Sequence, residues 1–595
     1  MKQNRMKLLA LLLSAGLLCP LISCTAPGEP TVTTDGRTEQ VTEPQSEHGT
    51  GDTANPDSVS IVANGVADFR IVRTGSTDAT LAGAAEKIQR LIRMLTKAEI
   101  PVIEPLEAEA GERLIVVGTS AGIDAVQNAT DALDIGEYGY LLRENVLMVI
   151  GQCDVTLNRA LSAFTSALTA AAGKGTLTLN LPESGVSFRY DGWLQGVPRI
   201  GKAFSSVYDC GNQTYQLLYR NTDAAACDEL EGLLGVQEGY SRSQGGTLGE
   251  NRFATYVCPG GEVSYLYQPS AKTLRVVCQS YAEHYVGIPS VEPETGYTKT
   301  GETQFALLPL NYEASCANPS DCSGFSAVMT LEDGRFIIID GGYAADADGL
   351  YNYLSDHNRR TDGITVAAWI LTHAHGDHIG CFKQFAKDYG ARVTVSCLIT
   401  NALPENVKPT AEANSSDLAR AEGFCGAFAG ETQIIKMHAG QRAWFCNVEM
   451  QMLFTQETLH PARVQYLNET STVFMLRAGG QNILITADCE LQETDALVRL
   501  WGDALKSDFY QINHHGYSGV TNALIRAVDP TVALWPTSEA TAAGRRQTAW
   551  YNELKKRIGE CIVADAGAKI LTLPYQPGSV AVLYEMDFTK RDAKQ

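Results

Sequence analysis

The pattern of hydrophobic and polar positions divides the chain into a leader, a polar segment and three regions able to bury a core. An apolar run over residues 8–18 follows three basic residues and is too short to span a bilayer comfortably. Residues 24–58 are rich in Thr, Pro and charged side chains, which is typical of a flexible tether. Regular apolar spacing then extends through three units, at residues 59–190, 195–300 and 303–590.

The first unit mixes segments of helical and strand period. Helical spacing predicts helices over residues 81–95 and 154–171. Apolar runs predict a strand at 113–118, a hairpin around 143–145 and a strand at 176–180. This β-α-β-β-α-β order predicts a small α/β domain, and its lack of histidine argues against a catalytic cluster there.

The second unit is also predicted to be a small α/β domain, of unknown role. Its pattern indicates a helix over 223–234 that ends at Gly235, and several strands, at 215–219, 254–257, 263–267 and 274–277. Six tyrosines could line a sugar-binding face, but half-buried strand positions are the favoured interpretation. These tyrosines are Tyr240, Tyr256, Tyr265, Tyr267, Tyr281 and Tyr285.

The third unit contains the strongest chemical signal, the motif T-H-A-H-G-D-H-I-G at residues 372–380. It follows an apolar strand at 366–371 and precedes a helix expected to begin near Ile379. His373 and His375 can converge on one metal, while Asp377 and His378 can turn toward a second. Imidazole and carboxylate ligands suit Zn²⁺, with Mn²⁺ or Fe as alternatives.

Three further strands of this unit end in polar side chains. Asp340 closes a strand at 336–339, where it is either a support behind the histidine loop or a plain turn residue. Asp488 ends a strand that begins at residue 482. His514 and His515 end a third strand and precede a glycine-rich turn.

The H-x-H-x-D-H motif resembles the signature of the metallo-β-lactamase superfamily. The resemblance implies an α/β fold of four αβ/βα layers in residues 303–590, with two metals sharing Asp488. It implies metal ligands at six positions, His373, His375, Asp377, His378, Asp488 and His515. His515 is the predicted last ligand, with His514 near substrate, and the reverse assignment is the alternative. Asp340 would lie behind the ligands and orient them.

One position departs from the superfamily pattern. Many members carry another histidine between the first motif and the bridging aspartate, and Asn468 stands at the matching place here. With the stretch around Asp488 and the H-H-G turn, this form resembles the branch of the DNA-internalisation competence protein ComEC. That branch also includes secreted phosphodiesterase-like proteins.

The resemblance implies a metal-dependent hydrolase. Two metals about 3.5–4 Å apart lower the pKa of a shared water, and the hydroxide attacks phosphorus or a carbonyl carbon. Asp377 or His514 could move the proton. The predicted substrate is a phosphodiester or related ester, such as a cell-wall component. Arg545, Arg546 and the basic run at 555–557 could face an anionic substrate, although the run is more simply a solvated face.

Charge and the leader bear on location and partners. The chain has 47 basic and 68 acidic residues, a net charge of −21, which disfavours nucleic acid as a partner. The leader, residues 1–23, ends in L-I-S before Cys24, which resembles a bacterial lipobox. We therefore expect an exported protein anchored to membrane lipid through Cys24. The oligomeric state is not predicted.

The fifteen cysteines do not describe a small disulfide scaffold. Cys316 and Cys322 are close enough in sequence to close a small loop, whereas Cys278, Cys397 and Cys446 lie in apolar runs and are predicted to be buried thiols.

Two other functions compete with the predicted hydrolase. The protein could be a surface binding protein with a degenerate hydrolase domain, for which Asn468 is the argument. It could also be a β-lactamase, although two additional N-terminal units make this less favoured.

Overall fold

The computed structural model describes residues 57–76, 79–181, 194, 196–202, 204–281, 285–318, 322–401, 403, 409–412, 421–579 and 581–591. The predicted leader, the predicted tether and Cys24 therefore lie outside the described residues. Across the part that is described, no helix combines the length and apolar character needed to cross a bilayer.

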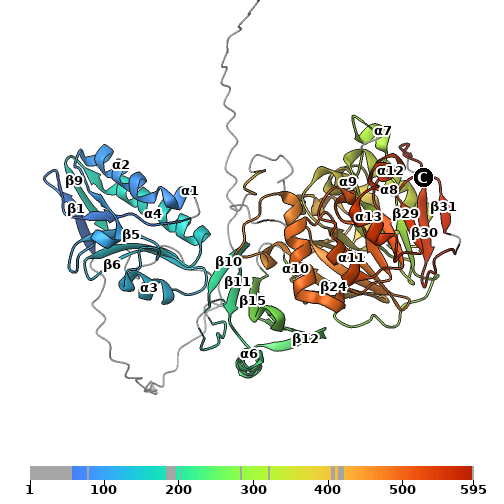
Figure 1. Cartoon of the computed structure of the whole chain (residues 1–595), viewed down its shortest axis with the longest axis horizontal. Coiled ribbons are helices and arrows are strands. Elements are labelled where there is room, and N and C mark those ends of the chain that lie inside the picture. The colour runs from blue at the N-terminus through green and yellow to red at the C-terminus, as the bar shows by residue number, and fades with distance from the viewer. Residues whose placement is uncertain are drawn as a thin grey trace, which may run out of the picture. The chain divides into compact units, whose positions relative to one another are not determined.

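The N-terminal region builds two sheets against a pair of packed helices. A four-stranded sheet has the order β2-β1-β9-β8, with β1 (Ser58–Ala63), β2 (Val66–Ala67), β8 (Ala172–Gly173) and β9 (Thr176–Asn180). A five-stranded sheet has the order β4-β3-β5-β7-β6, with β3 (Arg70–Val72), β4 (Val102–Ile103), β5 (Leu114–Val117), β6 (Tyr138–Arg143) and β7 (Val146–Gly151). Its helices are α1 (Ala79–Ala82), α2 (Ala84–Thr96), α3 (Asp124–Asp131) and α4 (Asp154–Ala171). Helices α2 and α4 lie side by side (Figure 1), and their apolar faces share one core with both sheets.

This region is α/β, as predicted, but it contains more strands and helices than the predicted β-α-β-β-α-β order. The expected helices and strands are present, and the pattern missed β1 to β4, β8 and α3. Four of these six elements, β2, β3, β4 and β8, are strands of two or three residues, too short to develop a clear period.

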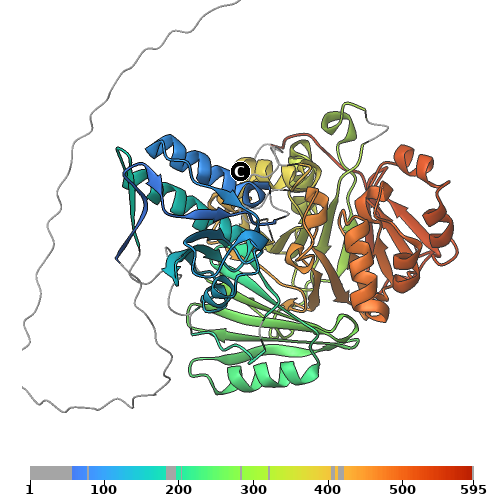
Figure 2. The same ribbon diagram turned by 60° about the vertical axis from the view of Figure 1, so that its left-hand side comes forward.

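The middle region is an antiparallel six-stranded sheet in the order β10-β11-β15-β14-β13-β12. Its strands are β10 (Ser206–Gly211), β11 (Thr214–Arg220), β12 (Ser241–Leu248), β13 (Asn251–Cys258), β14 (Gly261–Gln268) and β15 (Thr273–Ser280). Helix α6 (Ala224–Val236) packs along one face (Figure 2) and extends past Gly235, so the predicted stop at this glycine is wrong. Asp223 caps its start through the backbone N–H of Ala225.

The tyrosines of the middle region belong mainly to its interior. Tyr256, Tyr265, Tyr267 and Tyr285 are buried, and the other two of the six are half-buried. They therefore form no exposed aromatic face for a sugar, which agrees with the favoured interpretation from the sequence.

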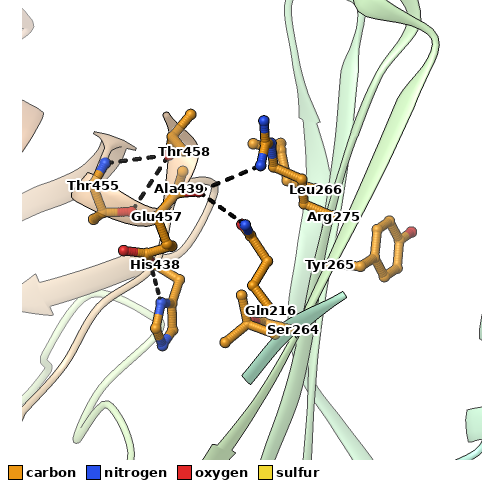
Figure 3. A pocket seen from close by; sticks show the side chains of 11 residues that line it. Gln216, Ser264, Tyr265, Leu266, Arg275, His438, Ala439, Thr455, Glu457 and Thr458 are labelled. Carbon is orange, nitrogen blue, oxygen red and sulfur yellow. Dashed lines mark hydrogen bonds and ion pairs between the residues drawn. The ribbon is translucent and has the colours of Figure 1, made fainter. Parts of the chain in front are cut away.

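The other face of the middle sheet carries polar side chains that bind the C-terminal region (Figure 3). The backbone oxygen of Glu457 accepts hydrogen bonds from Gln216 Nε2 at 2.9 Å and from the guanidinium of Arg275 at 3.4 Å. The Glu457 carboxylate contacts His438 Nδ1, and His438 Nε2 contacts Gln279. Burial lowers the pKa of Arg275 to about 10. The middle sheet and the C-terminal region therefore share a buried polar interface.

The C-terminal region consists of two sheets packed face to face. The nine-stranded sheet runs β22-β21-β19-β18-β17-β16-β30-β31, and β20 also pairs with β19. Its strands are β16 (Gln304–Leu307), β17 (Ser326–Thr330), β18 (Phe336–Asp340), β19 (Ile364–Leu371), β20 (Val393–Val395), β21 (Cys397–Thr400), β22 (Gln433–Ile435), β30 (Ala568–Thr572) and β31 (Val582–Tyr584).

The second, seven-stranded sheet follows the order β23 to β29. Its strands are β23 (Arg442–Phe445), β24 (Val448–Phe454), β25 (Val473–Ala478), β26 (Gln481–Ile485), β27 (Phe509–Gln511), β28 (Val532–Trp535) and β29 (Glu560–Val563).

Helices cover the outer faces of both sheets (Figure 1). They are α8 (Ala347–Asp356), α9 (Gly376–Tyr389), α10 (Leu491–Trp501), α11 (Asn522–Val528), α12 (Glu539–Arg545) and α13 (Ala549–Leu554), while the short α7 (Tyr312–Ser315) buries no residue in the cores. Alternate residues of β18 face different cores: Ile337 and Ile339 pack between the sheets, while Phe336 and Ile338 pack under α8 and α9. Strand β26 similarly directs Leu484 toward α10 and α11. The predicted four-layer αβ/βα architecture is confirmed.

Cysteines of the described residues fall into two groups. Cys316 and Cys322 form a disulfide beside α7. Cys278, Cys397 and Cys446 are free and buried, as their apolar surroundings in the sequence predicted.

Candidate metal centre

Four strand ends and one helix start supply the candidate site. β18 and β19 are parallel, as are β26 and β27, so the carboxyl ends of each pair meet at one edge. Asp340 ends β18, the histidine loop follows β19, Asp488 follows β26, and His515 follows β27. Helix α9 begins at Gly376, three residues earlier than predicted, which places Asp377 and His378 in its first turn.

Asp340 fixes the histidine loop from behind. One of its carboxylate oxygens accepts from the backbone N–H of Thr372 at 2.8 Å, and the other accepts from the Thr372 hydroxyl at 2.8 Å. The second oxygen also lies 2.7 Å from His378 Nδ1. Because a carboxylate only accepts, His378 carries its proton on Nδ1 and directs Nε2 into the site.

The turn after β27 orients His515 in the same way. Its Nδ1 donates to the carbonyl of Pro536 at 2.8 Å, which leaves Nε2 facing the site. His514 and His515 both have positive φ, at 45° and 53°. Gly516 follows at φ +81°, and an added Cβ there would lie 3.0 Å from Trp550 and 3.1 Å from Trp535, so a glycine is required.

Four side chains converge at the centre: Asp377, His378, Asp488 and His515. One ligand atom from each lies within 4.8 Å of the others. Oδ2 of Asp488 is 3.2 Å from Nε2 of His378 and 3.2 Å from Nε2 of His515. Oδ2 of Asp377 is 3.4 Å from His515 Nε2. Asp377 is half-buried and the other three are buried.

The electrostatics of this group reflect two carboxylates among imidazoles. Burial alone would raise the pKa of Asp488, but His378 and His515 outweigh it and hold that pKa well below its usual range. Burial alone would lower the pKa of His515, but Asp488 and Asp377 raise it to about 9. The same opposition raises the pKa of His378, whereas burial and the neighbouring His378 lower that of His373.

These atoms fit a divalent cation. Nε2 of His378, Nε2 of His515 and Oδ1 of Asp488 are buried without a hydrogen-bond partner. With Nδ1 protonated in both histidines, each Nε2 lone pair faces a carboxylate oxygen, an arrangement that needs either a second proton on each ring or a metal. Two imidazoles and two carboxylates are ordinary ligands of Zn²⁺ and related ions.

The sequence comparison agrees with this geometry. Residues 319–534 match the family model described as the metallo-β-lactamase superfamily. The C-terminal part of this chain is a metallo-β-lactamase-fold domain. This fold binds divalent metals and indicates a metal-dependent hydrolase. No curated protein matches the chain.

Solved structures similar to the chain align with slightly under half of it. The metallo-β-lactamase fold protein YhfI from Bacillus subtilis is 13% identical over 45% of this chain and 100% of its own, with a TM-score of 0.29. A putative metal-dependent hydrolase from Parabacteroides distasonis is 14% identical over 46% and 98%, with a TM-score of 0.26. Zn²⁺-bound PqqB from Methylobacterium extorquens is 10% identical over 45% and 100%, with a TM-score of 0.29.

The remaining donors of the metallo-β-lactamase-fold domain lie beside this group. His373 Nε2 is 3.9 Å from Asp488 Oδ2 and 3.1 Å from His375 Nδ1. His375 Nε2 is 3.7 Å from Glu412, which the sequence analysis did not single out. Asp488 Oδ2 therefore lies near His373 of the first predicted ligand set and near His378 and His515 of the second.

Asn468, His514 and Glu490 form a hydrogen-bonded cluster beside the four converging side chains. No role was predicted for Glu490. Asn468 Nδ2 is 3.3 Å from Glu490 Oε1 and 3.2 Å from His514 Nε2. His514 Nδ1 is 2.9 Å from Glu490, while its Nε2 is 4.0 Å from Asp488 Oδ2. The amide oxygen of Asn468 is buried without a hydrogen-bond partner. Glu490 is two positions after Asp488, within the stretch that resembles the ComEC-like branch.

Other polar residues of the domain lie elsewhere. His438 and His460 belong to the interface with the middle sheet, where His460 contacts Ser206. Lys556 and Arg557 pair with Glu553, which agrees with a solvated face for the basic run.

Proposed function

We propose that this protein is an exported, lipid-anchored, metal-dependent hydrolase that acts on a phosphodiester or a related ester. The observation that carries the hydrolase proposal is the convergence of Asp377, His378, Asp488 and His515. The last three of these residues each have a buried donor atom without a hydrogen-bond partner. A divalent metal pair held here would activate water as the nucleophile and neutralise developing negative charge.

Three polar side chains at the centre, Asp340, His514 and Asp377, then have distinct roles. Asp340 fixes the loop and the tautomer of His378. His514 is held at Nδ1 by Glu490, and its Nε2 lies 3.2 Å from the Asn468 amide and 4.0 Å from Asp488. It could therefore move a proton at a substrate oxygen only by giving up the contact with Asn468. Asp377 reaches the same centre from α9 and can share this proton transfer.

The substrate class rests on charge and location. The chain is strongly acidic, which disfavours a polyanion such as DNA as substrate. A membrane anchor outside the cytoplasm would present the domain to small phosphodiesters or to phosphate esters of the cell wall. The sequence around Asn468 and Asp488, similar to the ComEC-like branch, supports the phosphodiester class.

The anchor can be tested separately from the chemistry. We expect the full chain to incorporate a labelled fatty acid in a bacterial host and to sediment with membranes. A Cys24→Ala variant should lose the label and its membrane association. Retention of the label in that variant would contradict lipidation at Cys24.

The hydrolase is tested by elemental mass spectrometry of the mature chain together with turnover of bis-p-nitrophenyl phosphate. We expect two metals per chain and turnover that Asp488→Asn abolishes, whereas Asp503→Asn, an exposed aspartate of the same domain, leaves both unchanged. A chain without metal and without turnover after addition of Zn²⁺ or Mn²⁺ would instead favour a degenerate binding protein. Turnover of nitrocefin but not of the phosphodiester would favour a β-lactamase.

A further inference from the structure

Arg545 is a cation near the histidine turn of the candidate metal centre, and no carboxylate among the described residues forms an ion pair with it. It ends α12 and is half-buried. Within the described residues its side chain makes no ion pair, and its Nε is buried without a hydrogen-bond partner. Its neighbour Arg546 differs, because it pairs with Glu539 on the same helix.

Tyr517 holds Arg545 beside the histidine turn. The guanidinium carbon of Arg545 lies 3.5 Å from the centroid of the Tyr517 ring. That ring is 5.8 Å from the ring of His514 and 6.4 Å from the ring of His515. Tyr517 is 38% exposed, and its hydroxyl is 3.3 Å from Ser323. The aromatic platform is therefore fixed at both ends and faces solvent at the rim of the site.

Stacking leaves the guanidinium with its recognition edge available. An arginine that lies flat on an aromatic ring keeps its in-plane N–H groups free, and these match two oxygens of a phosphate or carboxylate. The Nε of Arg545 is itself buried, so a bound anion would contact the terminal N–H groups of the guanidinium.

We propose that Arg545, stacked on Tyr517, binds an anionic oxygen of the substrate next to the reacting centre. This inference rests on the proposed function. Within the class of phosphodiesters and related esters, it selects substrates with a phosphate or a carboxylate at the reacting group or next to it. Arg545 is thereby a substrate-binding residue, and Tyr517 is a positioning residue that acts through it.

Direct binding is the first test, and it does not depend on turnover. Phenylphosphonate is titrated into the zinc-loaded mature chain and followed by phosphorus NMR, with benzoate as a competing carboxylate. We expect Arg545→Ala to weaken phenylphosphonate binding about tenfold, the loss of one charge-assisted contact, with zinc content unchanged. Tyr517→Ala should weaken binding in the same direction, and Arg546→Ala should bind as the wild type does. Competition by benzoate that disappears in Arg545→Ala would identify carboxylate as the preferred anion.

Kinetics then separate this role from a structural one. Arg545→Ala should raise KM for bis-p-nitrophenyl phosphate about tenfold and leave the neutral ester p-nitrophenyl acetate unaffected, while Arg545→Lys restores part of the loss. Phenylphosphonate binding that is equally tight in Arg545→Ala would overturn the inference, as would equal losses on the charged and the neutral substrate. Anion binding that depends on Arg545 in a protein without any turnover would overturn the hydrolase proposal alone.

Discussion

Two buried clusters in the C-terminal region combine histidine with carboxylate, and they differ in how many ring nitrogens have a protein hydrogen-bond partner. At the interface with the middle sheet, protein atoms satisfy both ring nitrogens of His438, through Glu457 and Gln279. At the metal centre, protein atoms satisfy only Nδ1 of His378 and of His515, and each Nε2 faces carboxylate oxygens.

This difference separates a structural histidine from a candidate ligand. A ring with two protein partners is complete, and adding a metal would break one of its hydrogen bonds. A ring whose Nδ1 has a fixed partner and whose Nε2 faces carboxylates can exchange the proton on Nε2 for a cation. Burial does not distinguish the two cases, since His438 and His378 are both buried.

The largest expected difference between the clusters is their response to chelation. Removing metal with a chelator should lower the free energy of unfolding by about 4 kcal/mol if the metal is present at a thousand times its dissociation constant. The measurement is chemical denaturation before and after dialysis, with re-addition of Zn²⁺ as the control. An unchanged unfolding curve would mean that the centre is complete without metal, as the interface cluster is.

The interface cluster should instead respond to loss of its carboxylate. Burial raises the pKa of Glu457, but His438 outweighs it and keeps that pKa below its usual value. Glu457→Gln should therefore destabilise the fold by about 3 kcal/mol, because it leaves a buried partner without its countercharge. Metal content of the folded variant should equal that of the wild type. Loss of metal would show instead that the two clusters are coupled.

Asp340 tests the support behind the metal centre. Asp340→Asn keeps the size of the side chain but cannot accept from Thr372 and from His378 with both oxygens. We expect metal affinity to fall by about 10 to 100 times, as for other residues behind metal ligands. Competition with a chromophoric chelator measures this change. Unaltered affinity would reduce Asp340 to a plain turn residue.

Glu493 is a third kind of buried carboxyl group, because no cation of the described residues pairs with it and it is not one of the candidate metal ligands. It is fully buried in the first turn of α10, and burial raises its pKa to about 8. Because the folded pKa lies above the unfolded value of about 4.3, ionisation opposes folding as pH rises between the two. This group should lower stability by up to about 1.4 kcal/mol per pH unit across that window.

The test of that effect is urea denaturation at several pH values. Glu493→Gln stays neutral and can still accept from the backbone N–H of Glu490, so its stability should be flatter between pH 5 and pH 8. A variant with the same slope as the wild type would show that other groups dominate.

The sequence predicted the parts of the fold that depend on local pattern. The apolar runs in β18 and β19 indicated buried strands, and the motif at 372–380 indicated ligands at a strand end. The strands β2, β3, β4 and β8 escaped detection because two or three residues cannot display a period, and the six-residue β1 was missed as well. The extension of α6 through Gly235 was missed because a glycine weakens a helix without necessarily ending it.

The contacts of Glu490 and Glu412 with site residues could not be predicted from the sequence either. Glu490 contacts Asn468 from 22 positions away, and Glu412 approaches His375 across 37 positions that include α9, β20 and β21. No periodicity relates such residues, since their proximity depends on how the strands pair. The roles of His438 and Arg275 likewise depend on a sheet that precedes the domain in the chain.

Residue type and short-range spacing in the sequence indicated histidine and aspartate donors after buried strands, while the four-layer fold and the full ligand set were expected only from the resemblance to the metallo-β-lactamase superfamily. Only the tertiary structure decided that His515 rather than His514 faces Asp377 and Asp488 together, and that Glu490 holds His514. It also decided that Arg545 reaches Tyr517. These outcomes follow from backbone direction in one strained turn and from packing between distant elements, which local pattern does not encode.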